Sequence, residues 1–141
     1  MYDITSTRVG SAYSDQLQEW FIAEWGQVDP FSSNDIDHPL PCPIIATQDN
    51  KLLGGLSFTF AKIPNSTELG MWINAVLVAP EYRGLNIASK LVQSAEVEAT
   101  RMGEQHLYVY SEFPELYEKL GWQVEVIDGD SKALKKVLAV G

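Results

Sequence analysis

The chain of 141 residues is long enough for one hydrophobic core but not for two, so we expect a single domain over residues 1–141. Its composition, 45% hydrophobic and 21% charged, is that of a globular protein, and no apolar run approaches the roughly 18 residues of a membrane span. A formal net charge of −9 argues against nucleic acid as a partner, because nucleic-acid binding relies on lysine and arginine.

Cysteine and histidine are scarce, and the first ten residues lack the basic and then apolar pattern of a signal peptide. Cys42 is the single cysteine, which excludes an internal disulfide. One cysteine with two histidines also argues against a structural zinc site. We therefore expect a cytoplasmic protein that binds no metal and spans no membrane.

Charge is distributed unevenly along the chain. Residues 1–50 contain eight acidic residues and one basic residue, a net charge of −7, whereas residues 81–102 balance three acids against three bases. An anionic ligand would avoid the first region and tolerate the second. Acidic surfaces can also serve solubility alone, so the pattern has two readings.

The N-terminal region predicts a strand, a helix and a long loop. Residues 2–8 form the expected strand, and Ser14 offers an N-cap for the helix that follows. Apolar residues recur there at helical spacing and predict a core face: Leu17, Trp20, Phe21 and Trp25. A tryptophan at the exposed end of this face could instead line an acceptor pocket. Four prolines mark residues 26–43 as a long loop.

A hairpin follows the loop. Strands are expected at 43–47 and 52–61 around a turn at 48–51. Gly54 and Gly55 inside the second strand predict a bulge or a close backbone approach. The chain turns at 62–67 and returns as a strand at 68–78.

The segment 71–102 predicts a strand, a tight turn and a helix. Its first residues are apolar, several of them β-branched, as in a strand buried on both faces, and Pro80 ends the ladder. The apolar residues of the second part share one helical face: Ile87, Ala88, Leu91, Val92, Ala95, Ala99 and Met102. The first N–H groups of such a helix lack partners and attract anions, so the turn at 83–88 is suited to hold a phosphate.

This turn resembles a known motif. The run Val78-Ala79-Pro80-Glu81-Tyr82-Arg83-Gly84, followed by Ile87-Ala88-Ser89-Lys90-Leu91, is similar to motif A of the GNAT superfamily of N-acetyltransferases. That motif, Arg/Gln-x-x-Gly-x-Gly/Ala, binds the pyrophosphate of acetyl-CoA. Arg83 fits its first position and Ala88 its last. Asn86 replaces the usual first glycine, and we expect the turn to persist because asparagine tolerates a left-handed backbone.

The C-terminal region contains a second resemblance. A strand is expected at 106–110. A short helix should begin within residues 111–114 and end at Gly121. Two further strands are expected at 122–127 and 133–140. The sequence FPELYEKLGW at 113–122 is similar to motif B of the same superfamily, a short helix beside the thiol end of CoA. In many members its tyrosine protonates the departing thiolate, and that position here is Tyr117.

The resemblance implies both a fold and a cofactor site. The fold is an α/β (α+β) mixed sheet, mostly antiparallel and twisted, of about seven strands flanked by helices and splayed between the fourth and fifth strands. Acetyl-CoA, the implied cosubstrate, would lie in that wedge. The implied pantetheine-binding edge is Val76, Leu77 and Val78. The implied pyrophosphate-binding residues are Arg83, Gly84, Leu85, Asn86, Ile87, Ala88 and Ser89.

Acetyl transfer to an amine also requires acid and base groups. An alkylamine has a pKa of roughly 10.4, so a group must accept its proton, directly or through water. Glu68 and Glu112 are the candidate bases, although each could be a solvated surface carboxylate. Tyr117 is the candidate acid for the thiolate; it also belongs to an apolar helical stripe and could be a core residue.

The sequence therefore predicts an acetyl-CoA-dependent N-acetyltransferase that acts on a small-molecule or peptide amine. Transfer would be direct in a ternary complex, because Cys42 has no activating partner. The acidic N-terminal region favours a cationic acceptor. The alternative is a non-catalytic acetyl-CoA-binding sensor or partner module. The sequence leaves open a homodimer formed through the sheet edges.

Overall fold

The protein consists of a sheet with helices on both faces, in the predicted order. The computed structural model describes residues 2–8, 10–25, 40–84, 86–129 and 131–138. In chain order the elements are β1 (Asp3–Ser6), α1 (Ala12–Trp25), β2 (Ile44–Gln48), β3 (Lys51–Lys62), β4 (Leu69–Val78), the 3-10 helix η1 (Pro80–Tyr82), α2 (Ile87–Arg101), β5 (His106–Ser111), α3 (Pro114–Lys119), β6 (Gln123–Asp128) and β7 (Ser131–Val137). None of these described helices is long and apolar enough to cross a membrane.

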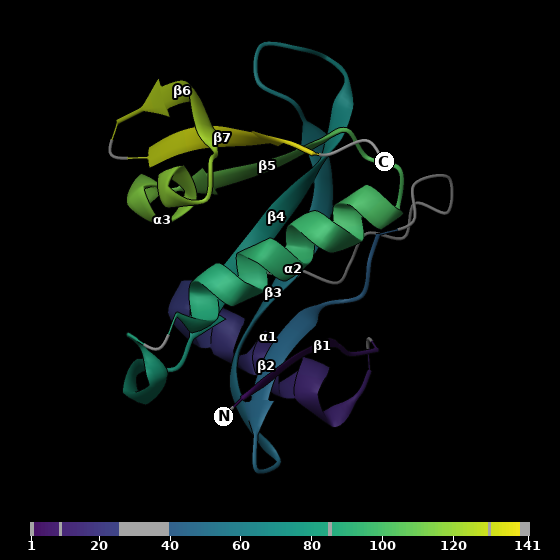
Figure 1. Ribbon diagram of the computed structural model, residues 1–141, viewed down its shortest axis with the longest axis vertical. Helices are drawn as coiled ribbons and strands as arrows, with labels where there is room; N and C mark the ends of the chain where they lie inside the picture. Colours follow the sequence, from purple (N-terminus) through teal and green to yellow (C-terminus); the bar gives the residue numbers. More distant parts are fainter. Residues whose placement is uncertain (1, 9, 26–39, 85, 130, 139–141) are drawn as a thin grey trace.

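The described strands form one seven-stranded sheet in the order β1-β2-β3-β4-β5-β7-β6. Every neighbouring pair is antiparallel except β4 and β5, which run parallel. α2 lies across one face of the sheet and α1 across the other (Figure 1). This arrangement confirms the predicted mixed, mostly antiparallel sheet flanked by helices.

The sheet opens between β4 and β5. Their pairing consists of two residue pairs, Trp72 with Tyr108 and Ile73 with Val109. Directly after Ile73, the register between β3 and β4 shifts, so that Asn74 has no partner on β3. Such a bulge bends its strand and increases its twist. We attribute the divergence of β4 from β5 to this bulge, which produces the splay expected between the fourth and fifth strands.

The buried face of α2 agrees with the predicted apolar face, with one exception. The fully buried side chains of this helix are Ile87, Leu91, Val92, Ala95 and Ala99. Ala88 is only partly buried. The prediction is wrong at Met102, which is 40% exposed, because the helix ends at Arg101 and Gly103 adopts a positive φ of 87°.

The N-terminus of α1 differs from the sequence prediction in its capping residue. The helix begins at Ala12, and Ser11 rather than Ser14 caps it. The Ser11 Oγ accepts the Ser14 N–H at 3.1 Å, which is the bond an N-cap makes three residues ahead. The Ser14 hydroxyl instead donates to the Ser11 carbonyl at 3.0 Å. Leu17 and Phe21 are completely buried, as their spacing predicted.

Both glycines in β3 lie at close contacts, as predicted. A Cβ on Gly54 would lie 2.7 Å from the Leu77 carbonyl oxygen, and one on Gly55 would lie 2.7 Å from Leu17 Cδ2. Real Cβ atoms do not approach other atoms so closely, so these positions hold β4 and α1 tightly against β3. The register between β2 and β3 also shifts beside Gly54, which confirms the bulge.

Candidate active site

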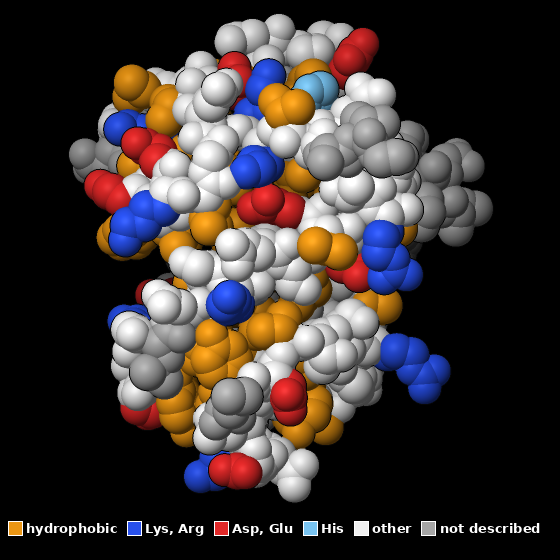
Figure 2. Space-filling view, viewed as in Figure 1, with side chains coloured by type: hydrophobic (Ala, Val, Ile, Leu, Met, Phe, Trp, Pro, Cys, Tyr) orange, Lys and Arg blue, Asp and Glu red, His pale blue; other side chains and the backbone are white. Residues whose placement is uncertain are grey.

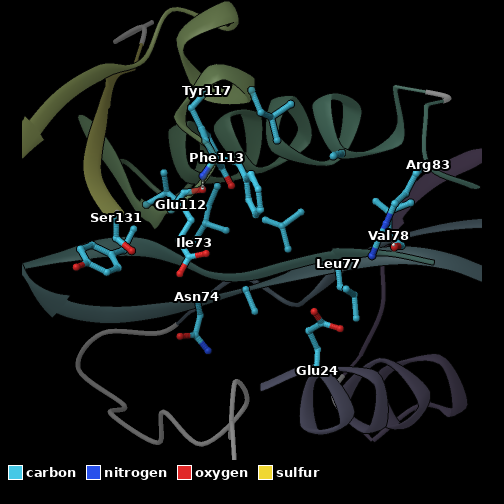
Figure 3. A pocket seen from close by; sticks show the side chains of 17 residues that line it. Glu24, Ile73, Asn74, Leu77, Val78, Arg83, Glu112, Phe113, Tyr117 and Ser131 are labelled. Carbon is cyan, nitrogen blue, oxygen red and sulfur yellow. Dashed lines mark hydrogen bonds between the residues drawn. The ribbon is translucent and has the colours of Figure 1, made fainter. Parts of the chain in front are cut away.

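A cavity of about 780 Å³ lies where β4 and β5 separate. Its lining comes from α1, β4, β5, β7, α3 and the start of α2 (Figure 3). Residues 73–78 of β4 all contribute, so both faces of that strand meet the cavity. In the space-filling view, the surface is indented between α3 and the start of α2 (Figure 2).

One edge of β4 is free along the cavity. Val76, Leu77 and Val78 pair on their other side with Leu56, Gly55 and Gly54 of β3. In the described strands, β5 pairs with β4 only as far as Ile73. The backbone groups that point from this edge into the cavity have no strand partner, and the Val78 carbonyl accepts a hydrogen bond from Arg83. The remaining groups can pair with the amide groups of a ligand. All three residues predicted to bind pantetheine line the cavity.

Two residues with a left-handed backbone shape the turn before α2. Gly84 has φ 87°, and Asn86, the N-cap residue, has φ 63° and ψ 19°. The left-handed conformation expected at Asn86 is thus confirmed. Its side chain makes no capping hydrogen bond, and the Asn86 carbonyl accepts the N–H of Lys90 at 3.1 Å. The N–H groups of residues 87–89 have no partner within the helix, and the helix dipole adds partial positive charge there.

Arg83 connects this turn to the free strand edge. Its Nε donates to the Val78 carbonyl oxygen at 3.2 Å, which fixes the guanidinium group at the end of β4. Arg83 is exposed and, together with Ala88, lines the cavity. A guanidinium group held at this position can donate its remaining N–H groups to phosphate oxygens.

The other described residues that were predicted to bind pyrophosphate do not line the cavity. Gly84, Asn86, Ile87 and Ser89 lie in the turn and in the first turn of α2, and the Ile87 side chain is 1% exposed in the core. Leu85 lies outside the described residues. The buried Ile87 side chain therefore anchors the start of α2 in the core.

Tyr117 projects from α3 into the cavity (Figure 3). It is 4% exposed and belongs to the main hydrophobic core, which confirms the reading of Tyr117 as a core residue, while its role as an acid stays a prediction. Its ring meets the Trp122 ring edge-on, with 5.3 Å between centroids. Burial raises the pKa of the Tyr117 hydroxyl above its usual range, so the group keeps its proton at neutral pH.

Hydrogen bonds hold α3 in place. The Trp122 N–H bonds to the Tyr117 carbonyl at 3.0 Å, and Gly121 has φ 90°, which confirms the predicted glycine at the helix C-terminus. The Trp122 indole Nε1 donates to Glu96 Oε2 of α2 at 3.1 Å. Lys136 donates to the Leu120 carbonyl and lies 3.7 Å from Glu96 Oε1. This network, which sequence reasoning did not find, connects α3 to α2.

The two predicted bases occupy different places. Glu112, between β5 and α3, lines the cavity. Glu68 is exposed at the far end of β4, where the strands are paired, and does not line the cavity. In the described part of the chain, no group of three or more His, Cys, Asp or Glu residues could hold a metal ion.

Sequence reasoning missed several polar residues of the cavity, among them Glu24 and Asn74. Glu24 reaches it from the last turn of α1, and Asn74 reaches it from the bulge of β4. Asparagine is rare inside strands, so Asn74 offered a weak local signal. Glu24 offered none beyond the acidity of its region.

Comparisons with known proteins agree with this architecture. The family model described as "Acetyltransferase (GNAT) family" matches residues 10–122. No curated protein matches the chain significantly.

Several solved structures share the fold. An aminoglycoside 6'-N-acetyltransferase complexed with coenzyme A superimposes with a TM-score of 0.71 at 17% identity, over 96% of each chain. An Arabidopsis thaliana protein in complex with the bisubstrate analogue CoA-Ac-MVNAL gives a TM-score of 0.70 at 14% identity, over 97% of this chain and 99% of that one. An IAA acetyltransferase from Bacillus cereus gives 0.66 at 18% identity, over 98% and 100%. At such identities the likeness concerns the fold alone.

Proposed function

Because the chain belongs to the GNAT acetyltransferase family, we propose that it is an N-acetyltransferase that moves an acetyl group from acetyl-CoA directly to a primary amine. One observation carries this proposal. A free strand edge, an uncapped helix N-terminus and a buried tyrosine border the same cavity, although the tyrosine comes from a different part of the chain than the other two. Each of them suits a different part of an acyl-CoA molecule.

The cofactor would lie along the wedge. The N–H groups at the start of α2 and the Arg83 guanidinium would hold the diphosphate. The free edge of β4 at Val76, Leu77 and Val78 would bond the pantetheine amides. Two of the structural neighbours carry coenzyme A or a CoA-linked analogue, which supports this choice of cosubstrate.

The reaction needs a base on one side of the thioester and an acid on the other. Glu112 accepts a proton from the amine, directly or through a water molecule, and the neutral nitrogen attacks the thioester carbon. A C–N bond forms and the C–S bond breaks, while a β4 backbone N–H stabilises the oxyanion. Tyr117 donates its proton to the departing thiolate, whose thiol has a pKa of about 8.5 by analogy with cysteine.

Two further assignments follow from positions in the fold. Glu112 is the proposed base in preference to Glu68, because Glu112 lines the cavity and Glu68 does not. Transfer is direct, because the thiol of Cys42 is exposed outside the described cavity lining and cannot serve as a covalent carrier there. Neighbours in complex with a peptide or a peptide analogue, and one named for aminoglycosides, support a peptide or small-molecule amine as acceptor.

The test combines acetyl-CoA binding by calorimetry with release of the CoA thiol over a panel of amines. The proposal predicts binding and amine-dependent thiol release. Binding without release to any amine would favour the non-catalytic sensor, and absence of binding would contradict both.

The choice of base is tested by a matched pair of variants. Glu112→Gln should lower kcat by about 100-fold, since it removes the proton acceptor but keeps the shape of the side chain. The same change at Glu68 removes the same charge outside the cavity and should alter kcat less than about twofold. The reverse pattern would assign the base to Glu68.

A further inference from the structure

Negatively charged side chains outnumber positively charged ones in the described lining of the cavity. Among the described lining residues, Arg83 is the cation, and Glu24 and Glu112 are the anions. Arg83 lies beside the start of α2, where the proposed diphosphate binds. Glu112 lies after β5, at the other end of the cavity from Arg83, and Glu24 lies on α1 beneath Leu77 (Figure 3). The described lining therefore carries more negative than positive charge, which favours a cationic acceptor.

Glu24 is unfavourably placed with respect to its own helix. It lies in the last turn of α1, a turn without basic residues, where the helix dipole leaves partial negative charge. In the described part of the chain, Glu24 has no ion-pair partner. Its carboxylate points from α1 toward β4, near Leu77 (Figure 3). A carboxylate that is disfavoured by its helix and has no ion-pair partner among the described residues can bind a cation from the cavity.

The wall beside Glu24 is apolar. Ala75 and Leu77 line the cavity and also pack in the hydrophobic cluster under α1, so their side chains lie on the same face of β4 as Glu24. Phe113, which is 71% exposed, lines the cavity next to Glu112 in the chain. Aliphatic methylene groups suit such a wall, because they gain free energy when removed from water.

We propose that the acceptor is a linear aliphatic diamine. Glu24 binds one terminal ammonium group, the apolar wall of Ala75 and Leu77 accommodates the methylene chain, and the second amine reaches Glu112 and the thioester. This inference rests on the proposed acetyltransferase function and adds the substrate class. One amine of the acceptor is thus bound through an ion pair, and the other amine is the one that is acetylated.

The test compares diamines with monoamines of equal chain length. We expect kcat/KM at low salt to be about tenfold higher for terminal diaminobutane and diaminopentane than for butylamine and pentylamine, through the one additional ion pair. Added salt should reduce this preference, because it screens exposed charges. Glu24→Gln should reduce the preference to less than about twofold.

A matched variant controls for the loss of charge on α1. Glu19→Gln removes the same charge from an exposed position of the same helix that does not line the cavity, and should keep the diamine preference. Equal acetyl-CoA affinity in both variants, measured by calorimetry, would show that both are folded.

The outcomes separate this inference from the function on which it rests. Absence of transfer to every amine would contradict the acetyltransferase itself. Transfer to monoamines and diamines at equal efficiency, or a diamine preference that survives Glu24→Gln, would overturn the diamine inference alone.

Discussion

The two ends of the cavity are built in different ways. At the start of α2, consecutive residues would form the proposed diphosphate site with their backbone, and two left-handed residues, Gly84 and Asn86, set the shape of the turn. At the other end, side chains from α1, β4 and the segment after β5 meet, and Glu24 and Glu112 are far apart in the chain. A site made of backbone groups depends on one short sequence segment, so all members of a protein family can share it. A site made of side chains from distant segments depends on tertiary structure, so it can differ between members of the family.

Tyr117 lies on α3, on the same side of the cavity as Glu112 (Figure 3), and the removal of its hydroxyl should have the largest effect. Tyr117→Phe keeps the edge contact with Trp122 but removes the proton donor, so kcat should fall about 100-fold to 1,000-fold. Acetyl-CoA affinity should stay unchanged, because neither end of the cavity loses a contact. Steady-state kinetics and calorimetry measure both quantities.

Tyr108→Phe is the matched control for this variant. It removes a hydroxyl from a tyrosine that is buried in β5 and does not line the cavity, and it should leave kcat within about twofold. If Tyr117→Phe also had full activity, the thiolate would need no acid from this residue.

Acetyl-CoA affinity should be sensitive to negative charge at the start of α2, where we propose that the diphosphate binds. Ala88→Asp places a carboxylate at the start of α2, where it should weaken acetyl-CoA binding by about 100-fold through repulsion of the diphosphate. The same carboxylate should not destabilise the fold, because acidic residues are favourable at helix N-termini. Calorimetry and thermal denaturation together separate the two effects.

Gln93→Asp serves as control, because residue 93 is an exposed position of the same helix away from the cavity. It should cost some helix stability without reducing acetyl-CoA affinity. Equal affinity losses in both variants would mean that charge on α2, rather than the site at its N-terminus, governs binding.

The contrast between the two ends also explains what the sequence could predict. The turn, the apolar face of α2 and the glycine after α3 are local patterns, and all three are present in the structure. The bulge at Asn74 depends on how β4 pairs with β3, and the position of Glu24 depends on how α1 packs across the sheet. Neither is encoded within a short segment.

The errors of the sequence prediction have the same origin. Ser11 and Ser14 are both acceptable caps, and the choice between them depends on the backbone that precedes α1. Met102 has the right helical phase to be buried, but the helix stops before it. The local sequence pattern fits either capping serine, and either a buried or an exposed Met102. Tertiary structure determines which of these is realised.

Alkaline pH should reveal the burial of Tyr117 through stability. Burial raises the pKa of this hydroxyl in the folded state, so its effect on stability is constant below pH of about 10, where the unfolded chain keeps its proton. Above that pH the unfolded state loses a proton that the folded state retains, and the free energy of unfolding should fall by up to about 1.4 kcal/mol per pH unit.

Tyr117→Phe lacks this contribution, so denaturant unfolding of both proteins between neutral and alkaline pH isolates it. The difference in their stability should be constant at neutral pH and should change in favour of the variant at alkaline pH. A difference that stays constant throughout would place the Tyr117 hydroxyl in contact with water.

The smallest expected effect concerns the departure of Asn86 from the family pattern. Asn86→Ala should cost about 1 kcal/mol of stability, because alanine tolerates a φ of 63° poorly, whereas Asn86→Gly should cost nothing. Denaturant unfolding measures the difference. Equal stability of the two variants would mean that the turn does not depend on the left-handed conformation.

The central claim is that the start of α2 holds a diphosphate and directs the thioester toward Tyr117. A crystal structure with acetyl-CoA tests it most directly. We expect phosphate oxygens within about 3.2 Å of the backbone nitrogens of residues 86–89, and the thioester between the free edge of β4 and the Tyr117 hydroxyl. A diphosphate bound elsewhere, or a thioester outside the wedge between β4 and β5, would contradict the account.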